Sequence, residues 1–103
     1  MPQDYAEAMR WYKKAADRKD TSAMRSIAKL YEDGRGVTKD PAEAMRWFGK
    51  AADLGDSFAA YAIGAHYLFA MGVPKDEFKG REWMKRAAAM GDDSANRWLI
   101  ENP

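Results

Sequence analysis

The sequence predicts an all-α fold, a right-handed α-solenoid of antiparallel helix pairs with a 36-residue period. The first observation is a stretch that occurs three times, with its tryptophan at Trp11, Trp47 and Trp83. The second is that apolar residues in each copy recur at i, i+3, i+4 and i+7, the spacing of one helix face. The third is that the segments between helices are short, which favours antiparallel neighbours. A fixed period in this range is typical of stacked repeats. The copies occupy residues 4–20, 40–56 and 76–92.

The central copy has the clearest helix boundaries, and we call this element and its copies the B helices. Asp40 can accept hydrogen bonds from the first turn, and Pro41 suits the first helical position because it has no N–H. Glu43 favours a helix N-terminus. Gly55 stands where a left-handed residue usually follows a helix. The predicted inward side chains are Ala44, Trp47, Phe48, Ala51 and Ala52.

The other two B helices are predicted at residues 4–18 and about 77–90. In the first copy, Lys19 stands where the others have Gly55 and Gly91. A lysine in the left-handed conformation costs roughly 1 kcal/mol relative to glycine. The predicted inward side chains of the first B helix are Ala8, Trp11, Tyr12, Ala15 and Ala16.

A second type of helix, the A helix, alternates with the B helices. It is predicted at residues 21–33, 57–69 and 93–101. Turns follow the first two A helices, at residues 34–37 and 70–74. At about 100° per residue, one face of each A helix is apolar. The predicted inward side chains are Ala23, Ile27, Leu30, Tyr31, Ala59, Ile63, His66, Tyr67, Ala95 and Leu99.

These elements make residues 1–103 a single array. We expect an orphan B helix at 4–18, repeats at 21–55 and 57–91, and a partial A helix at 93–101. Both ends look cut, because no A helix precedes the first B helix and terminal repeats normally carry polar capping faces. We therefore expect a segment of a longer array, or a minimal array that pairs through its ends.

Composition narrows the class of protein. The net charge is +1 with 32% charged residues, which favours neither a nucleic-acid coat nor disorder. The absence of cysteine excludes disulfides and fits a reducing compartment, so a cytoplasmic location is favoured. The sequence shows neither an 18-residue apolar run nor a signal-peptide pattern, and no membrane partner is expected.

No set of residues points to catalysis, a metal or a cofactor, and none is expected. His66 is the only histidine, and we expect it to be packed and hydrogen bonded. Gly34 and Gly36 follow a helix and lack the lysine of a phosphate-binding loop. The carboxylates fall mostly at helix caps and outer faces.

A basic ridge on the B helices is expected to be a solvated face rather than a nucleic-acid site, because the aromatics there point inward. It consists of Arg10, Lys14, Arg46, Lys50 and Arg86.

The repeat resembles the Sel-one-like repeat (SLR), a relative of the tetratricopeptide repeat. The resemblance rests on Ala, Ile, Tyr, Gly, Val, Asp, Trp and paired Ala residues at matching positions of both repeats. In the first repeat these include Ala23, Ile27, Tyr31, Gly34, Gly36, Val37, Asp40, Trp47, Ala51, Ala52 and Gly55. The second repeat departs at Ala70, which replaces a turn glycine, and at Gly80, which replaces a helix alanine. The resemblance implies an α-solenoid that binds other proteins.

The outward face of the A helices differs between repeats and carries our candidate site. The first repeat is polar there, whereas the second has Phe58, Tyr61, Ala65 and Leu68. Aromatics flanked by arginines are typical of interface hot spots, and an exposed apolar patch usually marks a binding site. The alternative is that Phe58 or Tyr61 packs between adjacent helices. The predicted partner-binding residues are Arg25, Lys29, Phe58, Tyr61, Ala65, Leu68 and Arg97.

These observations predict a non-catalytic scaffold or adaptor. It would bind a protein or peptide segment on its concave face, with an apolar anchor and acidic flanks on the partner. The alternative is a structural self-assembly element, a homo-oligomer formed through open array ends. An enzyme is a distant third, and neither nucleic acid nor a membrane is an expected partner.

Overall fold

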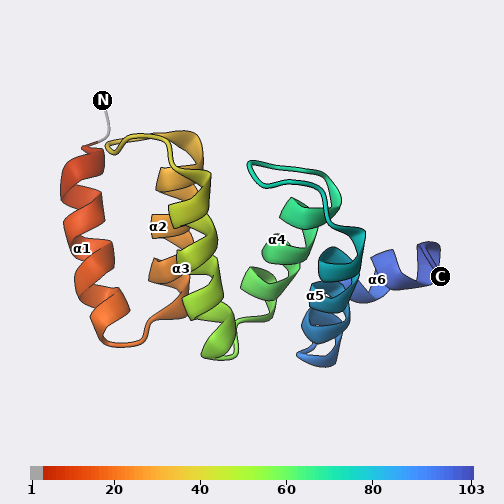
Figure 1. The fold of residues 1–103 in the computed structure, drawn as a ribbon. Coiled ribbons are helices and arrows are strands. Elements are labelled where there is room, and N and C mark those ends of the chain that lie inside the picture. Colours follow the sequence, from red (N-terminus) through yellow and green to blue (C-terminus); the bar gives the residue numbers. More distant parts are fainter. Residues whose placement is uncertain (1–3) are drawn as a thin grey trace.

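A computed structural model describes residues 4–103, and within this range the chain forms six helices and no strand. The helices from α1 to α5 lie one after another and alternate in direction, and α6 extends to the side at the C-terminal end (Figure 1). The predicted all-α solenoid is confirmed. The helices are α1 (Tyr5–Asp17), α2 (Thr21–Asp33), α3 (Pro41–Asp53), α4 (Ser57–Leu68), α5 (Glu77–Ala89) and α6 (Asp93–Glu101).

Every one of these helices begins after an aspartate. Its carboxylate accepts a hydrogen bond from the backbone N–H three residues on, as from Glu43 to Asp40 at 3.1 Å. Such a cap contributes about 1 kcal/mol, because it satisfies an N–H that lacks a partner within the helix. The six caps are Asp4, Asp20, Asp40, Asp56, Asp76 and Asp92.

Two junctions place a residue with a side chain in the left-handed conformation. Lys19 has φ +67°, where Gly55 and Gly91 have +97° and +100°. The predicted geometry at Lys19 is therefore confirmed. Ala70 has φ +52°, close to the +70° of its counterpart Gly34. The second turn therefore keeps the course of the first in spite of the substitution.

The core runs between the A and B helices. Ala28, Ala44, Ala51 and Ala87 are completely buried, so small residues allow these helices to approach closely. Two glycines mark a close approach between α4 and α5. A Cβ atom added at Gly64 would lie 3.1 Å from the carbonyl oxygen of Gly80.

The prediction that Trp11 points inward is wrong, because its side chain is 61% exposed. Met9 and Ala16 are the buried residues of α1. Trp47 and Trp83, at the equivalent positions, pack partly buried against the core. The difference arises because α1 packs chiefly on α2, whereas α3 and α5 each lie between two A helices.

Candidate functional site

Three adjoining cavities lie along the surface between α2 and α4. Their volumes are about 430, 390 and 300 Å³, and Lys29 lines all three. Glu32 and Met71 connect the first cavity to the second. Phe48 and Phe58 connect the second to the third. We call this continuous depression the α2–α4 groove.

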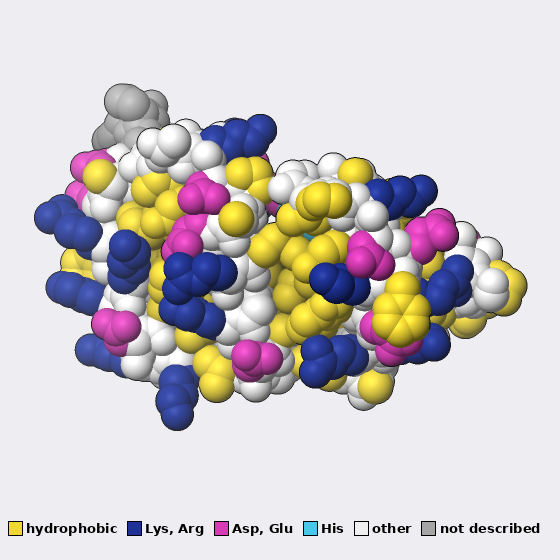
Figure 2. Space-filling view, viewed as in Figure 1, with side chains coloured by type: hydrophobic (Ala, Val, Ile, Leu, Met, Phe, Trp, Pro, Cys, Tyr) yellow, Lys and Arg dark blue, Asp and Glu magenta, His cyan; other side chains and the backbone are white. Residues whose placement is uncertain are grey.

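The middle of the α2–α4 groove is mainly apolar. Its lining includes the buried ring of Phe48 from α3. Phe58 and Phe69 are 49% and 60% exposed, and Met71 is 47% exposed. α4 itself contains no Asp, Glu, Lys or Arg. Figure 2 shows hydrophobic side chains gathered over α4, next to α3, with charged side chains on the helices to either side. The second repeat thus exposes apolar surface where the first repeat is charged.

An ion pair joins α2 to the start of α4. Nε of Arg25 donates to Oδ2 of Asp56 at 2.8 Å, and Nη2 donates to Oγ of Ser22 at 3.1 Å. The guanidinium also lies over the ring of Phe58, with Cζ 5.1 Å from the ring centroid. Arg25 therefore fixes the position of Phe58 and is largely engaged within the chain.

A second polar contact joins α2 to the end of α4. Nδ1–H of His66 donates to the carbonyl oxygen of Ala62 at 2.6 Å, and Nε2 faces Oε1 of Glu32. The other oxygen of Glu32 accepts from Nζ of Lys29 at 3.0 Å. Burial raises the pKa of Glu32, but the hydrogen bonds from Lys29 and His66 outweigh burial and hold the pKa below its ordinary value of 4.5. The prediction of a packed, hydrogen-bonded His66 is confirmed.

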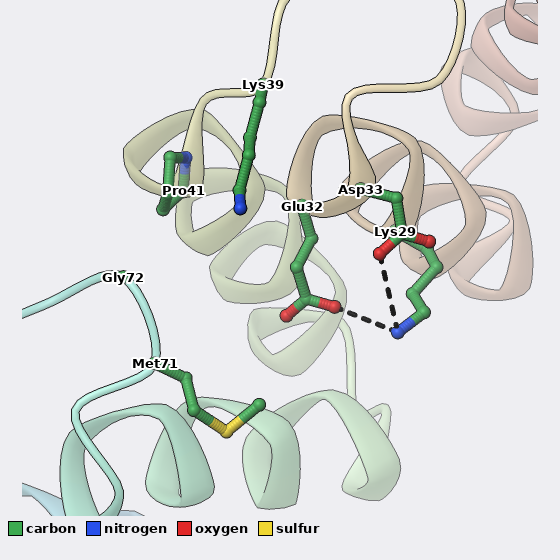
Figure 3. Close-up of a pocket in the computed structure, with 7 residues that line it drawn as sticks. All are labelled: Lys29, Glu32, Asp33, Lys39, Pro41, Met71 and Gly72. Carbon is green, nitrogen blue, oxygen red and sulfur yellow. Dashed lines mark hydrogen bonds and ion pairs between the residues drawn. The ribbon is translucent and has the colours of Figure 1, made fainter.

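Lysines line the end of the groove nearest the turns. Figure 3 shows Lys29 between Glu32 and Asp33, with Lys39 on the opposite side of the same cavity. The hydrogen bond to Glu32 raises the pKa of Lys29 above 10.5, so its amine is charged. Its side chain is nevertheless 64% exposed. A partner carboxylate can therefore approach Lys29 from solvent.

The structure brings five of the seven predicted residues to the α2–α4 groove. Arg97 instead lines a separate cavity of about 210 Å³, which it shares with Tyr61. Neither Phe58 nor Tyr61 is enclosed within the chain. The five groove residues are Arg25, Lys29, Phe58, Tyr61 and Ala65.

The prediction that Leu68 lies on the exposed face is wrong. Leu68 is only 7% exposed and turns toward α5. A Cβ atom at Gly80 would lie 2.6 Å from Cγ of Leu68. Leu68 therefore occupies the space that the usual alanine of this repeat position would take.

Sequence reasoning misses other residues of the groove. It assigns Phe48 to the core alone and does not single out Glu32. Phe69 and Met71 follow the last predicted inward residue of α4. The signal for them is the apolar run that continues past Leu68 into the turn.

The described residues offer neither a metal site nor a membrane span. Within residues 4–103, no three side chains of His, Cys, Asp or Glu are grouped so as to hold a metal ion. None of the helices in that range is both long enough and apolar enough to cross a membrane.

Solved structures of known proteins resemble the chain over most of its length. A Sel1 repeat protein from Oxalobacter formigenes is 40% identical with a TM-score of 0.77, over 87% of this chain and 37% of that chain. A protective antigen of uropathogenic Escherichia coli that displays an SLR fold is 37% identical with a TM-score of 0.83, over 96% of this chain and 21% of that one. Cysteine-rich protein B of Helicobacter pylori is 25% identical with a TM-score of 0.77, over 84% and 65%. The chain thus spans less than two thirds of each of these proteins.

The sequence model of the Sel1 repeat matches this chain three times, at residues 1–20, 21–56 and 57–92. No curated protein gives a match. Proteins built from this repeat are generally protein-interaction scaffolds and typically non-catalytic. Because the matches cover most of the sequence and the solved structures share the fold, the chain belongs to the Sel1 repeat family.

Proposed function

We propose that this chain is a non-catalytic protein-interaction scaffold whose α2–α4 groove binds a peptide or protein segment. The observation that carries the proposal is the apolar middle of the groove, where Phe58, Phe69 and Met71 remain exposed around a cavity of about 390 Å³. Exposed apolar patches rimmed by polar residues are typical of interaction sites. A cavity of this size is large enough for one bulky side chain of a partner.

The surroundings of the cavity favour a partner with an apolar anchor and neighbouring carboxylates. Phe58 and Tyr61 present aromatic surface, with ring centroids 6.2 Å apart. Aromatic side chains lose little conformational entropy on binding and often dominate interface energetics. Lys29 and Lys39 line the cavity at one end and would attract an acidic flank. Arg25 contributes less than its position in the sequence implied, because its Nε and Nη2 atoms are already bonded to Asp56 and Ser22.

Selection from a random peptide phage library against the intact chain tests the proposal. Selected peptides should share an aromatic or aliphatic anchor next to Asp or Glu. Tyr61→Ala should weaken their binding by about 30-fold or more, equivalent to about 2 kcal/mol. Trp11→Ala is the matched control, because it removes an exposed aromatic outside the groove and should leave binding unchanged.

Two results would contradict this function. One is a set of selected peptides that bind Phe58→Asp as tightly as the unaltered chain. The other is equal loss of binding in Trp11→Ala and Tyr61→Ala. Circular dichroism of each variant checks that its helices are retained.

A further inference from the structure

A buried histidine lies in the lining of the α2–α4 groove. Among the described residues, His66 is the only polar or charged side chain that is buried, at 4% exposure. It belongs to α4 and lines the same cavity as Phe58. The ring of Phe48 from α3 packs against it, with the ring centroids 5.7 Å apart. Because a charge in such surroundings is costly unless it is paired, the protonation of His66 depends on the atoms that its two nitrogens face.

The contacts of the two ring nitrogens require a proton on each. Nδ1 lies 2.6 Å from the carbonyl oxygen of Ala62, and a carbonyl oxygen only accepts, so Nδ1 carries a hydrogen. Nε2 faces Oε1 of Glu32, and an ionised carboxylate also only accepts. A neutral imidazole has a single N–H and cannot satisfy both contacts. A second proton therefore lies between Nε2 and Oε1.

The surroundings of Glu32 place that second proton on His66. The other carboxylate oxygen of Glu32 accepts a hydrogen bond from Nζ of Lys29 at 3.0 Å (Figure 3). A neighbouring ammonium group favours the ionised form of a carboxylate. Burial raises the pKa of Glu32, but the hydrogen bonds from Lys29 and His66 hold it below its ordinary value of 4.5. The contact between α4 and α2 is therefore an imidazolium paired with a carboxylate.

The helices around His66 offer its ring no other charged partner among their buried residues. From α2 the facing groups are Glu32 and, behind it, Lys29. From α3 the neighbour is the ring of Phe48. The buried residues of α5, which packs on α4, carry no titratable side chain. The other titratable side chains that line the first and second cavities of the groove are Asp33, Lys39 and Tyr61.

We propose that the proton shared by His66 and Glu32 holds the α2–α4 groove in its present shape, so that the groove changes, and binds its partner more weakly, as pH rises. Without that proton, the lone pair of Nε2 would face a carboxylate oxygen, and the two would repel. His66 is enclosed and bonded to Ala62, whereas the side chain of Glu32 is 19% exposed and paired with Lys29. Glu32 would therefore turn away with Lys29. Because Glu32 lines both the first and the second cavity, its withdrawal would widen the apolar one. The affinity part of this inference rests on the proposed function of the groove.

Nitrogen NMR of the free, untagged chain tests the shared proton directly, because His66 is the only histidine. At about pH 7 both ring nitrogens should give the signals of protonated nitrogen. Nε2 alone should lose its proton as the pH rises toward about 9, which is still below the ordinary pKa of tyrosine and lysine. The methyl signals of Ala65 and Met71 in the groove should shift at the same pH. The methyl signal of Ala16, which is buried in α1, should not shift.

Glu32→Gln is the matched variant, because an amide has nearly the shape of a carboxylate. Its NH₂ group can donate to a neutral Nε2 and its oxygen can accept from Lys29, so the contact needs no shared proton. His66 should then be neutral at about pH 7, and the two groove methyl signals should stay constant up to about pH 9. His66→Leu introduces the residue found at the equivalent Leu30 and should also remove the pH dependence.

A peptide selected on the groove, without His or Cys and with a blocked N-terminus, gives the second measurement. Its dissociation constant should rise by about fivefold or more between about pH 7 and 9, the lower end of ordinary coupling between two sites. Since coupling is reciprocal, the bound peptide should raise the pH at which Nε2 loses its proton. An equal change of affinity in the unaltered chain and in Glu32→Gln would overturn the role of the pair in binding.

Three results in the free chain would overturn the inference itself. They are an unprotonated Nε2 at about pH 7, a proton that Nε2 retains beyond about pH 9, and groove methyl signals that do not move when the proton leaves. A selection that yields no peptide for the groove would contradict the proposed function instead. The NMR titration would then still decide whether the proton controls the shape of the groove.

Discussion

Replacing Gly80 with alanine should destabilise the chain, although the same change in the middle of a helix normally stabilises. Gly80 lies inside α5 and faces α4. A Cβ atom there would lie 2.6 and 2.8 Å from Cγ and Cδ2 of Leu68, and 3.1 Å from the carbonyl oxygen of Gly64. Carbon atoms pack best at about 3.5–4.0 Å, so Leu68 would have to move. Leu68 is buried, and the Gly64 carbonyl belongs to a helix backbone, so neither group has free space nearby.

The expected magnitude combines two opposing effects. Alanine gains about 1 kcal/mol over glycine in helix propensity. Inserting a methyl group into a well-packed core costs typically about 1–3 kcal/mol. Two short contacts with a buried side chain and one with a backbone oxygen place this site toward the upper part of that range. We therefore expect Gly80→Ala to lower the free energy of unfolding by about 1–2 kcal/mol.

Gly49→Ala is the matched control, because Gly49 lies within α3 and a Cβ atom there would meet nothing within 4 Å. Urea unfolding should show a higher midpoint for Gly49→Ala and a lower one for Gly80→Ala. With a slope of about 2 kcal/mol per molar urea, each shift is about 0.5 M or more. The double variant Gly80→Ala, Leu68→Ala should lose less stability than the sum of the single changes. If Gly80→Ala raises the midpoint as Gly49→Ala does, the close packing of α4 on α5 is refuted.

Three further predictions follow from the backbone, the core and the groove. Lys19→Gly should stabilise by up to about 1 kcal/mol, because Lys19 has φ +67°; Lys19→Ala, which keeps a Cβ atom, should change the urea midpoint little. Phe48→Ala should cost about 3–5 kcal/mol through the cavity that it leaves, and a melt close to that of the unaltered chain would contradict the packing. The pKa of Glu32 is lowered on folding, so its contribution is fully present above its ordinary pKa of 4.5 and is lost as pH falls through the folded value. Stability of Glu32→Gln should therefore fall less steeply below pH 4.5 than that of the unaltered chain, and parallel curves would argue against the pairing with His66.

The 36-residue repeat of the sequence makes most of the fold predictable. Helix positions follow from local signals, namely the aspartate caps, the glycines after the B helices and the apolar spacing. The capping role of Asp20, Asp56 and Asp92 escapes the sequence analysis, although the signal is the same as at Asp40 and lies one residue before each A helix.

The errors arise where a residue's surroundings depend on a neighbouring unit. Trp11 matches Trp47 and Trp83 in sequence, but equivalence along the chain does not reveal whether a second helix covers the position. The angular position of Leu68 around the helix axis predicts a surface location. This prediction takes no account of the space that Gly80, which has no side chain, leaves on the neighbouring helix.

The contact between Glu32 and His66 at the edge of the α2–α4 groove could not be predicted from the sequence of either repeat alone. Glu32 and His66 are 34 residues apart and sit at different positions of the two repeats. Their contact depends on how α2 lies relative to α4. The apolar part of the groove is easier to predict from the sequence. Phe58 and Tyr61 stand where the other repeats have polar residues, and this difference is visible by comparing the repeats.

The aspartate caps have a consequence for changes in the length of this chain during evolution. Each helix obtains its cap from the residue immediately before it, so the first turn of one helix does not depend on a side chain from another. Duplication or deletion of one 36-residue period would therefore leave each helix start with its own hydrogen-bond acceptor. The only new requirement at the junction would be steric fit between adjacent units. Unequal recombination between repeats can thus produce longer or shorter descendants whose helices are each locally complete.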